Sequence, residues 1–327
     1  MSVSERPGPT GAGGTSGRLL EVENLRVEFR TRDGVAKVIN GVTYHVNAGE
    51  TLAVLGESGS GKSVTAQTIM GILDTPPGFV TGGQIRFHGK DMLRMSAEER
   101  RKIRAEGIAM VFQDALSALN PVFNVGFQIG EQFRIRRGMS RQDAKKRAIE
   151  LLDQVKIPNA KQRVMIAMSL ALDPEVLIAD EPTTALDVTV QAQIMDLLAD
   201  LRRERNMGLI LITHDLGVVA DVADRIAVMY AGRIVEEANV HELYAQPGHP
   251  YTKGLLESIP RLDEKGQELR TIKGLPPSLL NIPSGCPFHP RCPMAQPVCR
   301  EKVPPLLKLS DTRASACHFA EELVSRD

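Results

Sequence analysis

Several residue types are scarce in this chain of 327 residues, and each shortage excludes a class of protein. Tryptophan is absent and aromatic residues make up 4% of the chain, so side chains on which single-stranded nucleic acids stack are scarce. Lys and Arg together number 40, and so do Asp and Glu, so no net field attracts nucleic acid. We therefore expect no nucleic-acid partner.

Long apolar runs are also missing. No stretch approaches the roughly 18 apolar residues that a membrane-spanning helix requires. Residues 1–17 are rich in Gly, Ser, Thr and Pro, so we interpret them as a disordered tail and not as a secretory signal. With 42% hydrophobic residues the remainder can form a core, and we expect a soluble intracellular chain without a transmembrane segment.

Short apolar segments alternate with helical patterns over residues 18–258. Strands are expected over residues 19–29, 38–45, 51–55, 108–112, 176–179 and 209–212. Helices are expected over residues 62–73, 96–106, 140–155 and 164–172. This alternation predicts an α/β fold with a mainly parallel sheet covered on both faces. Beyond residue 258 the chain becomes proline-rich and loop-like, so we place a domain boundary there and treat residues 259–327 as an extension.

A glycine-rich motif follows the expected strand over residues 51–55. Its glycines let the backbone turn amide groups inward around phosphate oxygens, at the start of a helix whose dipole favours anions. Lys62 can reach the β- and γ-phosphates, and Ser63 can ligate magnesium. The motif predicts a nucleoside triphosphate site that contains Gly56, Ser58, Gly59, Ser60, Gly61, Lys62, Ser63 and Val64.

Two carboxylates end the apolar strand over residues 176–179. In this position Asp180 would lie beside the metal ion and Glu181 next to the attacking water. A carboxylate just beyond the metal can orient and partly deprotonate that water. The pattern is weak alone, because many helices begin with acidic residues. After a phosphate loop it predicts hydrolysis of the bound triphosphate.

Over about residues 19–258, the order of these motifs resembles that of the ATP-binding-cassette (ABC) ATPases. The resemblance implies a P-loop nucleotide-binding domain with an antiparallel β subdomain and a helical subdomain, here at about residues 114–172 and shortened. It also implies ATP and Mg²⁺ as ligands, with Lys62, Glu181 and His214 as catalytic residues.

The same resemblance implies roles for residues that would mean little alone. Phe29 matches an aromatic residue that stacks on adenine, although a core position in a strand would also explain it. Gln113 matches a glutamine that contacts magnesium with Ser63 and Asp180 and couples to a membrane partner. Asp187 matches a loop that contacts the opposite subunit, and His214 matches a histidine at the γ-phosphate.

Two segments are similar to the ATPase subunits of oligopeptide/dipeptide importers, a group that includes nickel importers. They are residues 112–121 (FQDALSALNP) and 286–293 (CPFHPRCP). The resemblance implies a peripheral protein at the cytoplasmic face of the membrane that energises peptide uptake. Its expected partners are a second similar ATPase, two transmembrane permease subunits and, indirectly, an extracytoplasmic peptide-binding protein. Nickel import and a soluble cassette ATPase of DNA repair or translation are the alternatives.

A Ser-Gly-Gly signature loop, which family members carry before the Asp-Glu strand, is missing here. The chain has no glycine between Gly138 and Gly208, and residues 157–164 run directly into a helical pattern. An internal deletion is the simplest account, and a diverged but functional loop is the alternative. Because each nucleotide site is shared, a deletion would leave one competent and one degenerate site in a heterodimer. A largely inactive, nucleotide-binding subunit is a further alternative.

The four cysteines all lie in the extension. Cys286, Cys292, Cys299 and Cys317 have the spacings C-x5-C, C-x6-C and C-x17-C. Disulfides are disfavoured in the cytosol, so a metal site is favoured over two disulfide bridges. Four thiolates suit zinc or an iron–sulfur cluster. Resemblance to peptide-importer ATPases favours a [4Fe-4S] cluster, with Zn²⁺ and unligated thiols as alternatives.

Overall fold

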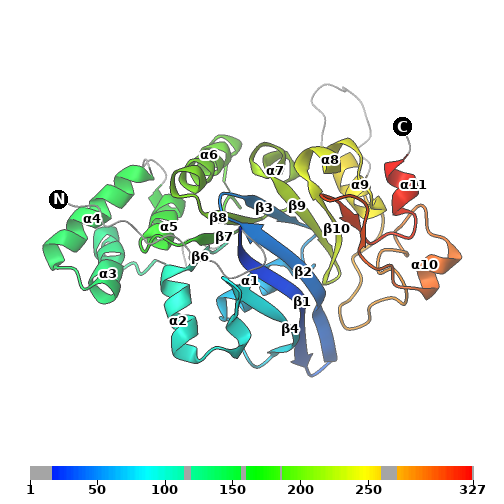
Figure 1. The fold of residues 1–327 in the computed structure, drawn as a ribbon, viewed down its shortest axis with the longest axis horizontal. Coiled ribbons are helices and arrows are strands. Elements are labelled where there is room, and N and C mark those ends of the chain that lie inside the picture. Colours follow the sequence, from blue (N-terminus) through cyan, green and yellow to red (C-terminus); the bar gives the residue numbers. More distant parts are fainter. Residues whose placement is uncertain (1–16, 114–118, 156–159, 185, 259–270, 326–327) are drawn as a thin grey trace.

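Two β-sheets meet at the centre of the structure, a computed structural model that describes residues 17–113, 119–155, 160–184, 186–258 and 271–325 (Figure 1). The larger sheet has eight strands in the order β11-β12-β10-β9-β3-β8-β7-β6. The neighbours from β9 to β6 pair in parallel, and β10, β12 and β11 continue the sheet in antiparallel pairing. The strands are β3 (Thr51–Leu55), β6 (Ile108–Val111), β7 (Val176–Asp180), β8 (Gly208–Ile212), β9 (Arg225–Tyr230), β10 (Arg233–Asn239), β11 (Leu307–Lys308) and β12 (Ala314–Ser315).

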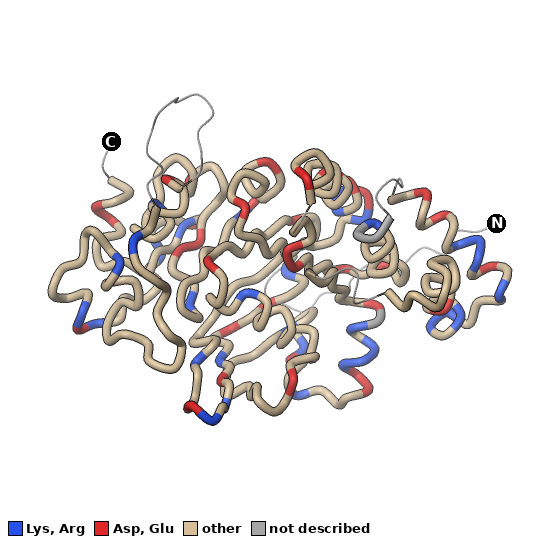
Figure 2. The backbone as a smooth tube through the Cα atoms, turned by 180° about the vertical axis from the view of Figure 1, so that it is seen from behind, with Lys and Arg blue, Asp and Glu red and all other residues tan. Residues whose placement is uncertain are grey.

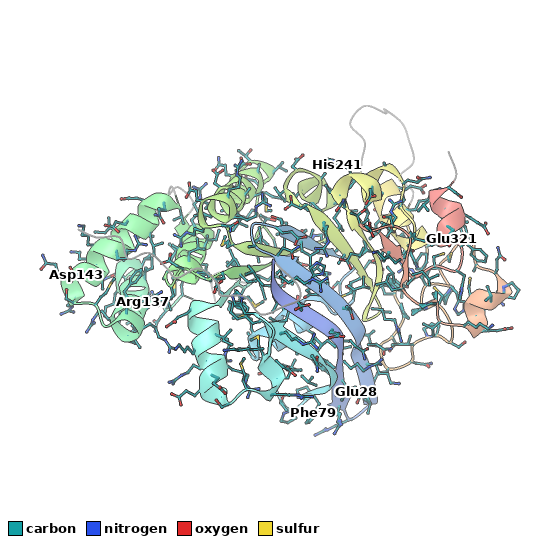
Figure 3. The ribbon with its side chains drawn as sticks, viewed as in Figure 1. Glu28, Phe79, Arg137, Asp143, His241 and Glu321 are labelled. Carbon is teal, nitrogen blue, oxygen red and sulfur yellow. The ribbon has the colours of Figure 1, made fainter. Side chains whose placement is uncertain are left out.

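The smaller sheet is antiparallel and has the order β2-β1-β4-β5. Its strands are β1 (Arg18–Thr31), β2 (Gly34–Asn47), β4 (Gly78–Phe87) and β5 (Lys90–Asp91). Glu28 of β1 and Phe79 of β4 are register partners at the outer end of this sheet (Figure 3). Together with the larger sheet, these strands confirm the predicted α/β class with a mainly parallel sheet and an antiparallel subdomain.

Successive side chains of each central strand of the larger sheet point alternately into two hydrophobic cores. Ala53 and Leu55 of β3 belong to the first core, which the helices α6 and α7 cover. Leu52 and Val54 point to the opposite face and belong to the second core, which the smaller sheet covers. Because both faces are buried, the strand β3 is apolar throughout except for Thr51, as the sequence pattern indicated.

Eleven α-helices and one 3₁₀ turn are present in the described residues. Helices α3, α4 and α5 lie together at one end of the molecule, with Arg137 and Asp143 near its tip (Figures 1 and 3). The helices are α1 (Lys62–Met70), α2 (Ala97–Glu106), α3 (Val125–Arg137), α4 (Arg141–Gln154), α5 (Ala160–Leu170), α6 (Val188–Arg205), α7 (Leu216–Val222), α8 (Val240–Ala245), α9 (Pro250–Glu257), α10 (Pro297–Glu301) and α11 (Ala320–Val324), and the 3₁₀ turn is η1 (Met92–Arg94). None of the described helices is long and apolar enough to cross a membrane.

Local sequence signals explain where several helices begin. A capping box begins α2: the Glu99 side chain accepts the Ser96 N–H (2.8 Å), and the Ser96 hydroxyl accepts the Glu99 N–H (3.3 Å). Ser140 caps α4 in the same way, by accepting the Asp143 N–H (3.1 Å). Basic residues outnumber acidic ones on α2, α3 and α4, although both signs are present on these helices (Figure 2).

The C-terminal extension continues the larger sheet. Its strand β12 pairs with β10, and the Ala316 N–H donates to the Val235 carbonyl (2.8 Å). Cys286, Phe288 and Cys299 belong to the first hydrophobic core together with β3 and α6. Residues on the two sides of the predicted boundary near 258 therefore share one core, and residues 259–270 lie outside the described part of the chain.

Acid should destabilise the fold through His249, a fully buried residue whose Nδ1 accepts the Tyr251 N–H (3.0 Å) at the start of α9. Burial lowers the pKa of His249 from its ordinary 6.5 to about 3. The unfolded chain therefore binds a proton more readily, and stability that is present above pH ~6.5 is lost as the pH falls towards 3. Between pH 7 and pH 5 we expect this imidazole to account for a loss of about 2 kcal/mol.

The free energy of unfolding in urea, measured at both pH values for the native chain and His249→Asn, checks this expectation. Asparagine keeps a capping acceptor but does not titrate. The variant should therefore lose about 2 kcal/mol less on acidification than the native chain. An equal loss in both proteins would contradict it.

Candidate functional site

The phosphate loop joins the carboxyl end of β3 to the start of α1. Its first and last glycines lie where no side chain fits. A Cβ on Gly56 would lie 2.2 Å from the Met229 carbonyl oxygen, and one on Gly61 would lie 2.8 Å from the Val38 carbonyl oxygen. Gly61 also has a φ of +105°, in the region that favours glycine. The glycines thus let the loop pack closely against β2 and β9.

A cavity of about 590 Å³ lies over this loop, within the range of small-molecule sites. Most of the predicted site residues line it, and they come from four separate segments. Its walls are Val38, Glu57, Ser58, Gly59, Gly61, Lys62, Ser63, Val64, Gln113, Glu181, His214 and Leu279. The structure therefore brings the phosphate loop, Gln113, Glu181 and His214 together around one space.

The ammonium group of Lys62 is held over the loop by the loop itself. Its Nζ donates to the carbonyl oxygens of Gly56 (2.7 Å) and Glu57 (3.1 Å). Burial lowers the pKa of Lys62, while the nearby Glu181, Asp180 and Glu57 carboxylates oppose that shift. A bound phosphate would supply charged acceptors in place of neutral carbonyls, and this exchange favours an anion at the loop.

Ser63 and Asp180 form the oxygen-rich side of the site. The Ser63 hydroxyl donates to Asp180 Oδ1 (3.0 Å), and the Asp180 side chain is buried. Burial raises the pKa of this carboxyl, and the Ser63 hydrogen bond opposes the rise. A hydroxyl and a carboxylate are the oxygen ligands that Mg²⁺ prefers, so these two residues fit a magnesium ion bound with the phosphates.

Glu181 is oriented by donors from three segments. Its Oε2 accepts the Gln113 amide (2.7 Å) and the Thr184 hydroxyl (3.0 Å), and its Oε1 lies 3.3 Å from His214 Nδ1. Its backbone has a φ of +45°, which is unusual for a residue with a side chain and recurs at functional sites. The carboxylate is thereby fixed at the edge of the cavity, one residue beyond Asp180.

Five predicted site residues are not part of the cavity wall: Phe29, Gly56, Ser60, Asp180 and Asp187. Phe29 is half-buried and packs against the second core, while Val38 and Leu279 supply the apolar lining. Ser60 is buried beneath the loop, where its carbonyl accepts the Gly232 N–H (3.0 Å). Asp187 caps α6 by accepting the Val190 N–H (3.0 Å).

Sequence reasoning missed Leu279, Glu57 and Thr184. Thr184 follows Glu181 by three residues, and that short spacing could have indicated a contact between the two side chains. Leu279 comes from the extension, and no local signal links it to the phosphate loop.

The four cysteines line a second, much smaller cavity together with Phe288. Cys286, Cys299 and Cys317 are buried, and burial raises the pKa of Cys286, Cys292 and Cys317. Within the part of the chain that the structure describes, no group of three Cys, His, Asp or Glu side chains is placed to hold a metal ion. The thiols therefore converge on one space without forming a single-ion site.

Comparisons with known proteins agree with this geometry. Residues 39–184 match the family described as ABC transporter, and residues 235–299 match the family described as oligopeptide/dipeptide transporter, C-terminal region. The oligopeptide transport ATP-binding protein OppD of Salmonella typhimurium is 48% identical over 99% of this chain and 100% of the relative. The dipeptide transport ATP-binding protein DppD of Bacillus subtilis is 46% identical over 93% of this chain and 96% of the relative.

Solved structures with the same architecture are also ABC proteins. The dimeric ATP-binding cassette MJ0796, in a post-hydrolysis state bound to ADP and Pi, has a TM-score of 0.61 and 27% identity. The match covers 68% of this chain and 99% of that chain. CbiO1 of Clostridium perfringens, part of the transporter complex cbiONQ, has a TM-score of 0.61 and 30% identity over 70% of this chain and 92% of that chain.

Replacing Lys62 should remove most of the affinity for a triphosphate. A hydrogen bond to a charged group is worth about 1.5–3 kcal/mol, so Lys62→Ala should weaken MgATP binding by about 10- to 100-fold. Titration with a fluorescent ATP analogue measures the effect. Lys90→Ala, at an exposed lysine of β5, is the matched control. Unchanged affinity in a folded Lys62→Ala protein would show that the triphosphate does not bind at this loop.

Proposed function

Because the chain belongs to the ABC transporter family, in its oligopeptide/dipeptide branch, we propose that it hydrolyses ATP to drive the import of short peptides. One observation carries the proposal: Lys62, Ser63 and Glu181 line the same cavity at the phosphate loop, and the buried Asp180 accepts a hydrogen bond from Ser63 (3.0 Å). The relatives named above act on oligopeptides and dipeptides, which favours peptides over nickel as cargo and a transporter over a soluble ATPase of DNA repair or translation.

Each group at the cavity has a distinct part in hydrolysis. The loop amides and Lys62 bind the β- and γ-phosphates and offset the charge that develops on them. Ser63 and Asp180, with Gln113 nearby, would hold Mg²⁺, which when bound neutralises phosphate charge. Glu181 accepts a proton from the attacking water, and Gln113, Thr184 and His214 keep its carboxylate in place.

A membrane subunit is the proposed partner at a groove beside the Gln113 segment. This groove has a volume of about 430 Å³, and its apolar lining includes Phe112, Ile135, Met165 and Met168. Phe112 is 40% and Ile135 69% exposed, so both present apolar surface to a partner. Gln113 directly follows Phe112 and contacts Glu181. A permease segment bound in this groove would therefore contact Phe112, the residue next to a contact of the catalytic Glu181. Two permease subunits and an extracytoplasmic peptide-binding protein complete the proposed transporter, in which this chain lies at the cytoplasmic face of the membrane.

The second proposed partner is a similar ATPase with an intact signature loop. Helix α4 ends at Gln154 and α5 begins at Ala160, and none of the intervening residues is glycine. Residues 156–159 lie outside the described part of the chain. These facts support an internal deletion and a heterodimer in which this chain's own phosphate loop forms the competent site.

Hydrolysis should therefore require the partner. Loss of one preorganised donor costs about 10²–10³ in rate, so the isolated chain should bind ATP but hydrolyse it at least 100-fold more slowly than the heterodimer.

Glu181→Gln in the heterodimer should keep the ATP affinity and lower turnover by about 10²–10⁴, because the attacking water loses its base. Steady-state phosphate release and ATP titration measure both quantities. Rapid turnover by the isolated chain, or full turnover by the Glu181→Gln heterodimer, would refute the proposal.

We further propose that the four cysteines hold a [4Fe-4S] cluster. All four thiols line one small, largely buried cavity, as the ligands of one multi-iron group would. A single Zn²⁺ would need ligand atoms arranged as a tetrahedron around one ion, and the described residues include no such group of side chains. A cluster here would tie together a segment that has little regular secondary structure of its own.

Iron content tests this proposal. Protein purified without oxygen should contain about four irons per chain and absorb visible light. Cys286→Ser should lose both properties and melt at a lower temperature. One zinc per chain, or no metal at all, would contradict the proposal.

A further inference from the structure

The C-terminal extension reaches the phosphate loop through one arginine. Arg291 lies between Cys286 and Cys299, and its guanidinium donates to both carboxylate oxygens of Glu57 (2.6 and 2.9 Å). Glu57 is the second residue of the loop, 234 positions earlier in the chain. The Arg291 side chain is 5% exposed and the Glu57 side chain 26%, so the arginine is shielded from water while the carboxylate borders the cavity.

The backbone of Glu57 is held from both sides. Its N–H donates to the Tyr251 hydroxyl (2.9 Å), and its carbonyl accepts from Lys62 Nζ (3.1 Å). Tyr251 belongs to α9 and is fully buried. The peptide at the start of the loop, together with its side chain, is therefore fixed by three groups, and two of them, Tyr251 and Arg291, lie far along the chain.

An aromatic cluster makes this contact rigid. The rings of Tyr230, Tyr251 and Phe288 lie 4.6–5.3 Å apart, and all three side chains are buried. The Arg291 guanidinium lies over the Tyr230 and Phe288 rings at 5.8 and 6.0 Å, and it also donates to the Lys273 carbonyl (3.2 Å). The arginine thus has little freedom to move away from Glu57.

The charge of Glu57 explains why the loop would need this arginine. Glu57 lines the cavity that is proposed to take a triphosphate, and an unpaired carboxylate there would repel the phosphates. Arg291 neutralises that carboxylate and holds both of its oxygens. Because the arginine belongs to the extension, the extension supplies part of the charge balance and support of the phosphate loop.

We propose that Arg291 is a positioning residue for the phosphate loop and that it acts through Glu57, so that the extension contributes to ATP affinity. The nucleotide readout of this inference rests on the proposed function. The ion pair itself does not, because both of its partners belong to this chain.

A double-mutant cycle on MgATP affinity tests the proposal. Arg291→Gln should weaken binding by about tenfold, as expected for the loss of a charge-assisted contact. In the Glu57→Gln background the same change should alter affinity by less than about twofold, since the carboxylate that Arg291 neutralises is gone. Arg300→Gln, at an exposed arginine of the same extension, should leave affinity unchanged. Equal losses in both backgrounds, or no loss in either, would overturn the proposal.

Hydrogen exchange of the nucleotide-free protein provides a second readout. Amides of residues 56–63 should exchange faster in Arg291→Gln than in the native chain, whereas those of β8 should not change. If Arg291→Gln does not fold, Glu57→Gln replaces it, because this variant keeps the side-chain size and removes the carboxylate that Arg291 holds. Unchanged loop exchange in the folded variant would contradict the proposal. Failure of the native chain to bind ATP, with altered exchange in the variant, would contradict only the proposed function.

Discussion

The carboxyl ends of four parallel strands meet at one edge of the larger sheet, and the site depends on that constraint. The strand β3 ends in the phosphate loop and β7 ends in Asp180 and Glu181, while β6 and β8 are followed closely by Gln113 and His214. Parallel pairing brings these ends side by side, although they lie far apart in the sequence. Hydrogen bonds from Gln113 and His214 to Glu181 then tie the strand ends together.

Much of this arrangement could be predicted, because its signals are local. The strand β3 has the predicted bounds, 51–55, because a run buried on both faces must be apolar and the glycine that follows ends it. Glu181 and Lys62 were predicted from short patterns in which the chemistry and the backbone geometry occupy the same few residues. The structure places both at one cavity.

The remainder of the site depends on contacts that local patterns do not encode. In the sequence, Arg291 is one residue within a cysteine-rich motif, and Glu57 is one of the residues between the glycines of the phosphate loop. Neither position indicates a contact with the other. Only the fold brings them together. Phe29 likewise is half-buried and packs against the second core, whereas Leu279, from the extension, lines the cavity. The predicted boundary near residue 258 followed a change in composition, but a proline-rich segment can still add strands to an existing sheet edge, as β11 and β12 do.

The phosphate loop thus has two supports, the sheet beneath it and the extension beside it, and the proposed partner supplies its cover. A structure of the heterodimer with Mg²⁺ and a non-hydrolysable ATP analogue tests this account most directly. The account predicts that the β- and γ-phosphates contact Lys62 and the loop amides, that Mg²⁺ lies at Ser63 and Asp180, and that Arg291 still holds Glu57. A nucleotide bound away from residues 56–63 would contradict it.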